Sequence, residues 1–269
     1  MYKKNQHVLL LVQELNPNKN ALNHALKIAS IFKSKVLISH SPFSKNRISE
    51  EDLKNYISDL DNVDTMQLTV EKDEPNKIIK ELNIIFMFIE VDTKNDFKFF
   101  LKNNIFSWIL NAKIPTFIVG DKTSTNTDYS NIILPIDYKK ESKEKMIWAS
   151  YFGRFNNAVV QLIPATEKEE IFMKTIRNTL LFTKKMFSQF IFNYRIHKSK
   201  LSSKHIDEEA FKTSTTKESD LVVLMTGKAQ GIFFLRYNSK KIKHFIKHYP
   251  NPILLINPLK DYYLPCDGS

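Results

Sequence analysis

The chain has 269 residues, of which 42% are hydrophobic and 26% charged, an ordinary composition for a folded globular protein. Its apolar runs are far shorter than the ~18 consecutive apolar residues that a membrane helix needs, so we expect no contact with a membrane. The net charge of +11 could suit nucleic acid. Lysine is spread through the whole chain, however, and forms no patch, so we expect no nucleic-acid partner.

The ends of the chain indicate its compartment. The apolar run that follows Met1 to His7 is interrupted at Gln13 and Glu14, which makes it too short for a signal peptide. The single cysteine, Cys266, cannot form an internal disulfide, which fits a reducing environment. We therefore expect a cytoplasmic protein.

An internal repeat is the clearest organising feature. Segment 7–13 (HVLLLVQ) recurs 124 residues later as 131–137 (NIILPID), and segment 113–119 (KIPTFIV) resembles 251–256 (NPILLI). Matching starts and ends indicate that whole domains are repeated. Each half, at about 125 residues, is long enough to bury its own core.

The first half alternates strands with helices. Residues Ala21, Ala25 and Ile28 are spaced like the buried face of a helix, and Ser49 is a typical helix N-cap. We predict strands at 8–12, 35–40, 65–70, 84–91 and 116–119, with helices at 18–32, 50–60, 75–82 and one through Trp108. Strands that read as continuous apolar runs between helices predict a parallel sheet with both faces covered.

The second half repeats this order. We predict strands at 132–136, 158–163, 190–197, 221–225 and 253–256, with helices at 141–155, 168–187, 206–213 and 239–248. Segment 120–128 contains no apolar residue and is predicted to be an exposed linker. The predicted domains are 1–120 and 129–258, followed by a C-terminal tail at 259–269.

These segments resemble a known family. Segment 131–137 followed by Ser142, together with 220–225, a glycine-containing loop and 252–256, resembles the universal stress protein (UspA-like) family. The first half resembles it more faintly, mainly through 114–119, so the chain resembles a tandem member. The resemblance implies two Rossmann-like (adenine nucleotide alpha hydrolase-like) domains. Each would be an α/β layer with a five-stranded parallel sheet in the order 3-2-1-4-5 and helices on both faces. It also implies dimerisation through the last strand in many members, and ATP binding in some.

The ATP-binding members carry a glycine motif: Gly, two residues, Gly, nine residues, then Gly with Ser or Thr. Backbone N–H groups at such a loop hold phosphates. Here the loop has Gly227 and Gly231, but neither of two alignments to the closing pair at Ser239 restores the spacing. Lys228 adds positive charge, and Asp137 matches the family aspartate that contacts the nucleotide. A nucleotide in the second half would therefore bind near Asp137, Gly227, Lys228, Gly231 and Ser239.

The simpler interpretation is structural, with glycines that only turn the loop and Asp137 as a helix cap. We accordingly expect no cofactor, with ATP in the second domain as the alternative. In the first half, Gln13 replaces the aspartate, and the corresponding loop has no glycine and carries Glu90, Asp92 and Asp96. Carboxylates repel phosphate, so we expect no ATP there.

Other candidate sites are weaker. His244 and His248 are one helical turn apart, as in some metal sites, but they stand among lysines without a third ligand nearby. We expect a solvated basic helix face and no metal. Cys266 has no recognisable base, so we expect no catalytic residue.

Two functions remain. The first is a stress-response accessory protein without catalysis that binds an unknown protein partner or a small ligand. The alternative is an ATP-binding sensor or weak ATPase that uses the second domain. Strands 116–119 and 253–256 are short and apolar, and each would be exposed at a sheet edge unless covered. We expect them to pair and form an internal pseudo-dimer, with a further homodimer left open.

Overall fold

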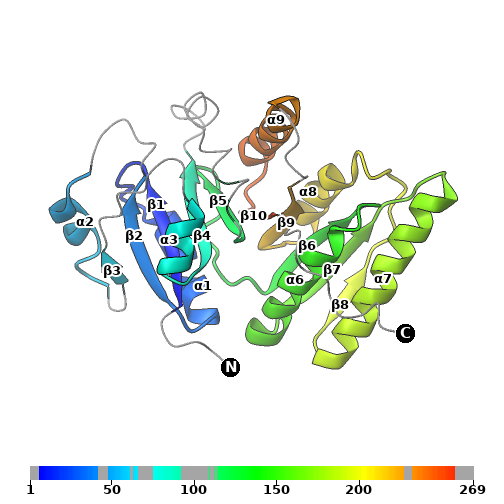
Figure 1. Cartoon of the computed structure of the whole chain (residues 1–269), viewed down its shortest axis with the longest axis horizontal. Helices are drawn as coiled ribbons and strands as arrows, with labels where there is room; N and C mark the ends of the chain where they lie inside the picture. Colours follow the sequence, from blue (N-terminus) through cyan, green and yellow to red (C-terminus); the bar gives the residue numbers. More distant parts are fainter. Residues whose placement is uncertain are drawn as a thin grey trace.

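The computed structural model describes residues 6–41, 48–60, 63–65, 75–91, 109, 112, 114–226 and 232–257. Its ten strands form one sheet in the order β3-β2-β1-β4-β5-β10-β9-β6-β7-β8, with helices packed along it (Figure 1). The order reads 3-2-1-4-5 from the outer edge inward in each half, and every strand pair within a half is parallel. The predicted fold class is therefore confirmed.

The helices and strands follow the predicted alternation. The first half contains β1 His7–Val12, α1 Asn20–Ile31, β2 Lys35–His40, α2 Glu50–Tyr56, β3 Val63–Thr65, α3 Pro75–Glu81, β4 Ile84–Val91 and β5 Thr116–Gly120. The second half contains β6 Asn131–Ile136, α6 Ser142–Asn156, β7 Val159–Pro164, α7 Glu170–Phe190, β8 Tyr194–Ile196, α8 Ile206–Thr216, β9 Leu221–Met225, α9 Ile232–His248 and β10 Ile253–Ile256. Ser49 caps α2 as predicted, because its Oγ accepts a hydrogen bond from Asp52 N at 3.0 Å.

The two halves are joined through their final strands. Strand β10 pairs with β5 antiparallel, which places Leu254 opposite Phe117 and Leu255 opposite Thr116. The expected pairing of these strands is confirmed. Because of this pairing, the ten strands form one continuous mixed sheet, whereas the sequence predicts two separate parallel sheets. The edge strand of each half supplies the backbone hydrogen-bond partners that the edge strand of the other half lacks.

Two predicted boundaries are wrong, and two further predictions fall largely outside the described residues. Strand β8 has only three residues because α7 continues to Phe190, its buried side chains repeating at helical spacing as far as Phe187. Helix α9 begins at Ile232, before the predicted start at Ser239. Strand β3 is described at 63–65, while 66–70 lie outside the described residues, as does most of the helix predicted through Trp108.

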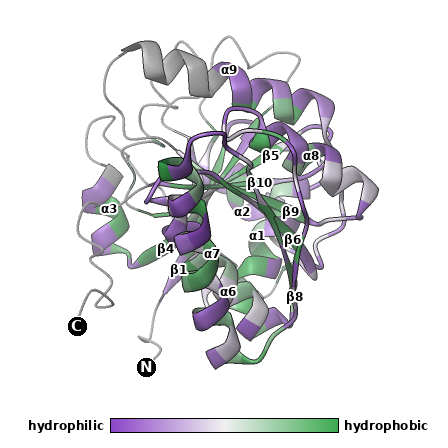
Figure 2. Cartoon of the chain, turned by 90° about the vertical axis from the view of Figure 1, so that its right-hand side faces the viewer, coloured by the Kyte–Doolittle hydropathy of each residue, from purple (hydrophilic) through white to green (hydrophobic). Residues whose placement is uncertain are grey.

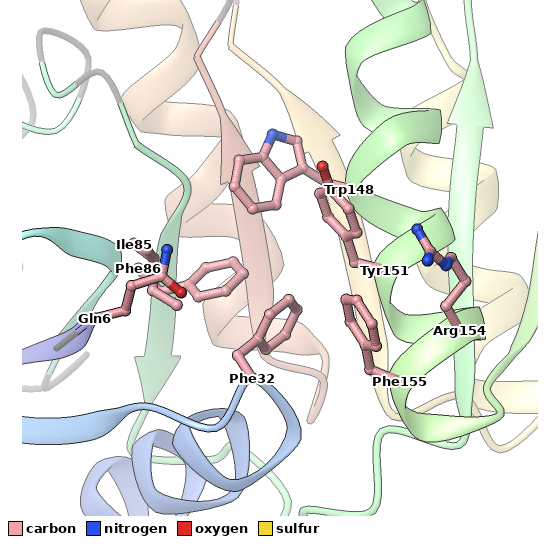
Figure 3. A pocket seen from close by; sticks show the side chains of 8 residues that line it. All are labelled: Gln6, Phe32, Ile85, Phe86, Trp148, Tyr151, Arg154 and Phe155. Carbon is pink, nitrogen blue, oxygen red and sulfur yellow. The ribbon is translucent and has the colours of Figure 1, made fainter. Parts of the chain in front are cut away.

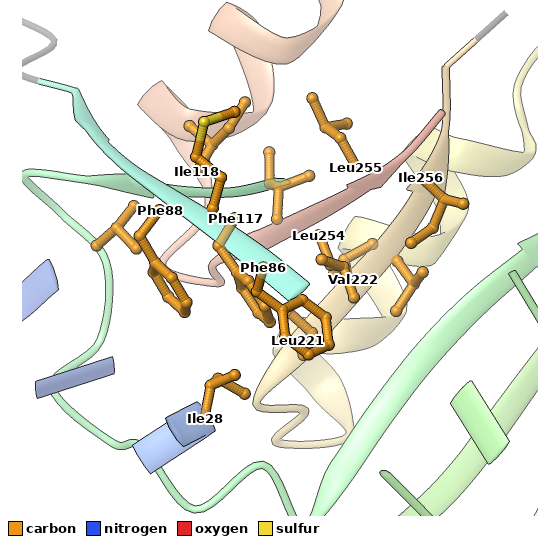
Figure 4. Close-up of a cluster of buried hydrophobic side chains, with 14 of the residues drawn as sticks. Ile28, Phe86, Phe88, Phe117, Ile118, Leu221, Val222, Leu254, Leu255 and Ile256 are labelled. Atoms are coloured by element: carbon orange, nitrogen blue, oxygen red, sulfur yellow. The ribbon is translucent and has the colours of Figure 1, made fainter. Parts of the chain in front are cut away.

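The core runs without a break across the junction. The ring of Phe117 on β5 stacks on Phe88 of β4, with 4.3 Å between centroids, and the apolar side chains of β9 and β10 continue the same layer (Figure 4). Helices α6 and α8 both pack against β6, β7 and β9 and cover the two faces of this part of the sheet. In Figure 2 the hydrophobic colours gather on the strands and the hydrophilic ones on the outer helix faces.

The linker between the halves is held more firmly than the sequence predicts. Most of 120–128 is exposed, but Thr123 is buried, and its carbonyl accepts a hydrogen bond from Asn20 Nδ2 at 3.0 Å. Ser124 N donates to the Pro250 carbonyl at 2.7 Å. The segment is thus bonded to both halves, and the prediction of a purely exposed linker is wrong.

A buried polar pair strengthens this attachment. His24 on α1 and Tyr129 are both fully buried, and His24 Nδ1 lies 2.7 Å from Tyr129 Oη. His24 Nε2 lies 2.9 Å from the Ser124 carbonyl, which can only accept, so Nε2 carries the proton. Nδ1 of the neutral ring then accepts from the tyrosine hydroxyl.

No helix among the described residues is long and apolar enough to cross a membrane.

Candidate functional site

The place for a ligand in such a sheet is the crevice beyond the carboxyl ends of the strands, where the strand order reverses. In the second half this point lies between β6 and β9, which are neighbours although β7 follows β6 in the chain. Asp137 directly follows β6, and Thr226 directly follows β9. The sheet topology therefore places Asp137 at this crevice.

Asp137 is bonded within its own loop. Its Oδ1 accepts hydrogen bonds from Ser142 Oγ and, at 3.2 Å, from Lys139 N. The Lys139 ammonium lies 3.9 Å from Oδ2, and the aspartate side chain is only 14% exposed. Asp137 thus fixes the turn between β6 and α6 through the Ser142 hydroxyl and the backbone N–H of Lys139, whereas the N-cap position of α6 is Glu141.

A buried lysine lies beneath this turn. Lys145 on α6 is 2% exposed, and its Nζ donates to the carbonyl of Pro135 in β6 at 2.5 Å. Burial lowers the pKa of the Lys145 ammonium, and the nearby carboxylates of Asp137 and Asp207 partly offset this. The Lys145 Nζ therefore lies at the floor of the crevice, within the electrostatic influence of Asp137 and Asp207.

The crevice continues into a basic recess between α8 and α9. Asp207 on α8 forms an ion pair with Lys241 on α9 at 2.5 Å, with both side chains about one quarter exposed. Next to this pair lies a recess of about 330 Å³, whose lining also includes His205, Lys240 and His244. Three lysines, Lys204, Lys240 and Lys241, outnumber the one carboxylate of the lining, Glu208, which pairs with Lys212, so the recess suits an anionic group.

The loop after β7 closes another side of the crevice. Glu167 Oε1 accepts a hydrogen bond from Ser203 N at 2.6 Å, and Ser203 Oγ accepts from Tyr138 N at 3.2 Å. The exposed ring of Tyr138 stacks on Phe172 of α7 at 4.4 Å between centroids. These contacts join the loops after β6, β7 and β8 into one wall.

The structure describes only two of the five predicted site residues, Asp137 and Ser239. Asp137 lies at the crevice, whereas Gly227, Lys228 and Gly231 fall outside the described residues. Ser239 lies in the interior of α9, because this helix begins at Ile232. The predicted helix start at Ser239 is therefore wrong, while the predicted place of Ser239 beside a nucleotide stays a prediction.

Sequence reasoning missed Lys145 and the Asp207–Lys241 pair. A signal for Lys145 exists, since it falls at helical spacing between the buried residues Ser142, Met146 and Ala149 on the same face of α6. No comparable signal exists for Asp207 and Lys241, because only the packing of α8 against α9 brings them together.

The equivalent crevice of the first half has a different chemistry. Gln13 follows β1 and is buried. Glu90 lies within β4, where Oε1 accepts a hydrogen bond from Asn16 Nδ2 at 2.8 Å. Burial and the charge of Glu90 raise the pKa of the neighbouring Tyr56. Asp92 and Asp96 lie outside the described residues.

The histidine pair of α9 bonds within its own helix. His248 Nδ1 lies 2.8 Å from the His244 carbonyl, and the two rings stack at 4.3 Å between centroids. In the part of the chain that the structure describes, no three His, Cys, Asp or Glu side chains gather as a metal site requires.

Comparison with known proteins identifies the fold. No protein-family model matches the chain, and no curated protein matches it either. Among solved structures, a universal stress protein from Archaeoglobus fulgidus DSM 4304 superimposes with a TM-score of 0.65, at 11% identity, over 95% of this chain and 97% of its own. The chain has the fold of a universal stress protein. A functionally unknown protein from Pseudomonas aeruginosa PAO1 gives a TM-score of 0.63 at 12% identity, over 94% of this chain and 92% of its own.

Both superpositions extend over nearly the full length of both chains, so the structural similarity covers both halves of this chain. Identities this low show the fold alone. What the chain does must therefore be argued from the residues at its crevices.

Proposed function

We propose that this chain is a stress-response accessory protein, similar to universal stress proteins, that acts without catalysis by binding a small ligand or a protein partner. The support comes from the crevice of the second half, where the charged groups are engaged inside the protein. Asp137 is bonded to Ser142 and Lys139, Lys145 to the Pro135 carbonyl, and Asp207 to Lys241. A general acid or base must instead be within reach of a substrate proton.

The test is turnover by the purified full chain with ATP and Mg²⁺. We expect phosphate release no faster than that of an Asp137→Asn variant, since Asp137 holds a turn and activates no water. Faster release by the parent, lost in the variant, would show that Asp137 takes part in hydrolysis. Mass analysis of compounds released from the native protein on denaturation tests the other half of the proposal, because it identifies any small ligand that the protein carries.

The second candidate is a nucleotide sensor, and one observation favours it. Lys145 at the crevice floor and the lysines of α9 place positive charge at the strand ends where this fold receives ligands. The alternative therefore predicts that ATP binds in the second half and that catalysis is not needed for its action. Lys241 and Lys145 would then contribute to ATP binding in place of the glycine motif, whose spacing this chain lacks.

Calorimetric titration of the full chain with ATP separates the two candidates. If the sensor function holds, Lys241→Met weakens binding, whereas Lys35→Met does not, because Lys35 is an exposed lysine on β2 of the other half. Equal effects of the two substitutions would indicate attraction by net charge alone. The absence of measurable heat with the parent would leave the accessory function as the stronger candidate.

A further inference from the structure

A cavity between the two halves is the strongest feature that the proposed function leaves unused. It has a volume of about 410 Å³, within the ~300–1,000 Å³ range of small-molecule pockets. The first half contributes Phe32, Ile85 and Phe86, and α6 of the second half contributes Trp148, Tyr151 and Phe155. Figure 3 shows these side chains facing one another across the space between α6 and β4.

The cavity is separate from the crevice of the second half. Ile85 and Phe86 lie at the start of β4, and Gln6, which also lines the cavity, directly precedes β1. The cavity therefore opens where the strands of the first half begin, whereas ligands of this fold bind where strands end. A molecule bound here would not compete with one at Asp137.

The walls are aromatic, and their rings meet edge to face. Phe32 lies 4.7 Å from Phe86 and 5.9 Å from Phe155, measured between ring centroids, at interplanar angles of 63° and 74°. Trp148 lies 5.2 Å from Phe86 at 65°. At these distances the rings are in edge-to-face contact and form a continuous aromatic wall, and a flat aromatic molecule can stack on the ring faces that this wall turns toward the cavity.

Polar groups at the cavity narrow the chemistry of the ligand. Trp148 and Tyr151 are half-buried, and among the described residues neither Trp148 Nε1 nor Tyr151 Oη makes a hydrogen bond. Because both side chains are only partly buried, solvent can reach these two donors, and an acceptor atom on a bound molecule can take the place of that solvent.

The charge at the cavity argues against a cationic ligand. Arg154 contributes the one charged side chain among the described residues of the lining. Its guanidinium carbon lies 4.3 Å from the ring centroid of Phe190 and 5.2 Å from that of Phe155, so the charge is engaged in cation–π contacts on the rings of α6 and α7. An uncharged ligand fits these surroundings best.

We propose that this inter-half cavity is a binding site for an uncharged planar heteroaromatic molecule, which stacks among the aromatic walls and accepts hydrogen bonds from Trp148 or Tyr151. The site exists only in the joined molecule, because each half supplies part of its wall. It therefore gives the pairing of β5 with β10 a role in binding as well as in covering strand edges. The inference does not depend on the function proposed for the crevice of the second half.

The probe is quinoline, which is flat, uncharged at neutral pH and carries one ring nitrogen as acceptor. Ligand-observed NMR titration of the full chain should show saturable binding of quinoline and much weaker binding of cyclohexylmethanol, which is apolar but not flat. Excess ATP should leave quinoline binding unchanged. Displacement by ATP, or equal binding of both probes, would overturn the proposal.

Three variants locate the binding. Ile85→Trp fills the cavity from β4 and should abolish quinoline binding. Tyr151→Phe keeps the ring, removes only the hydroxyl, and should weaken binding about 2- to 10-fold if the hydroxyl bonds to quinoline, as expected for one lost hydrogen bond. Tyr138→Phe, at an exposed ring of the same half, is the matched control and should change nothing.

Unchanged binding in a folded Ile85→Trp variant would place quinoline elsewhere and refute the site. If instead a second copy of the chain fills the cavity, the parent will sediment as a dimer, Ile85→Trp as a monomer, and quinoline will not bind the parent. That outcome would also refute a small-molecule site.

Discussion

The buried His24–Tyr129 pair can be tested by removing a single oxygen atom. Tyr129→Phe deletes the hydroxyl that donates to His24 Nδ1 at 2.7 Å and leaves the two rings in place. Both side chains are fully buried, so no water replaces the lost donor. An unpartnered buried acceptor costs about 1–3 kcal/mol, and we expect Tyr129→Phe to lower the free energy of unfolding by this amount.

The partner substitution shows whether the effect belongs to the pair. In a His24→Leu background the Tyr129 hydroxyl has already lost its acceptor, so Tyr129→Phe should then be nearly neutral or stabilising. The two substitutions should therefore be non-additive by about 1–3 kcal/mol in urea unfolding followed by circular dichroism. A fully additive cycle, or a neutral Tyr129→Phe in the parent, would refute the hydrogen bond as a source of stability.

The same pair gives the unfolding free energy a dependence on pH. Burial lowers the pKa of His24 below its ordinary value of 6.5. The unfolded chain then binds more protons than the folded one just below pH 6.5, so stability is complete above this pH and falls as the pH drops toward the folded pKa. His197, whose pKa burial also lowers, contributes in the same direction. We expect His24→Leu to flatten the decline below pH 6.5 without abolishing it, and an unchanged slope would show that folding does not lower the His24 pKa.

Three further predictions concern other buried positions. Lys145→Met should raise the free energy of unfolding at pH 7 by about 1 kcal/mol or more in urea titration, because it removes a desolvated charge. This gain should shrink at alkaline pH, where the lysine loses its proton. Joint substitution of Phe117→Lys and Leu255→Lys places charges in the β5–β10 junction and should lower the melting temperature or elongate the molecule in solution scattering; an unchanged shape and melting temperature would contradict the junction. Gly153→Ala places a Cβ 2.5 Å from the Phe192 ring, and this overpacking should cost about 1–3 kcal/mol. The cost should exceed the ~0.5–1 kcal/mol by which alanine stabilises a helix relative to glycine, so calorimetry should show a lower stability of the variant.

Local sequence patterns predicted most of the strands and helices. Strands 35–40, 84–91 and 221–225 match β2, β4 and β9 residue for residue, because each is an apolar run bounded by polar or turn residues. Errors occur where a helix pattern competes with a strand pattern. Residues 190–193 are apolar enough for a strand, but the preceding helix continues to Phe190 because its buried face still has core to pack against.

The candidate site was predictable only in part. Asp137 could be placed from the sequence because it directly follows a strand, and the ends of parallel strands meet at one edge of the sheet. The start of α9 could not, since the sequence before Ser239 carries no N-cap signal at Ile232, where the helix begins. Lys145 is a lysine at an apolar position, and burial of such a residue becomes visible only when the floor of the crevice is in place.

The sequence by itself determined the repeat, the order of strands and helices, and the short apolar strands 116–119 and 253–256 whose exposure would be unfavourable. Tertiary structure alone decided what those strands produce: one mixed sheet, a linker bonded through His24, and an aromatic cavity built from Phe32, Phe86 and Trp148. The physical reason is the range of the interactions. Helix and strand patterns arise between residues a few positions apart, whereas Phe86 and Trp148 come from different halves and meet only in the joined tertiary structure.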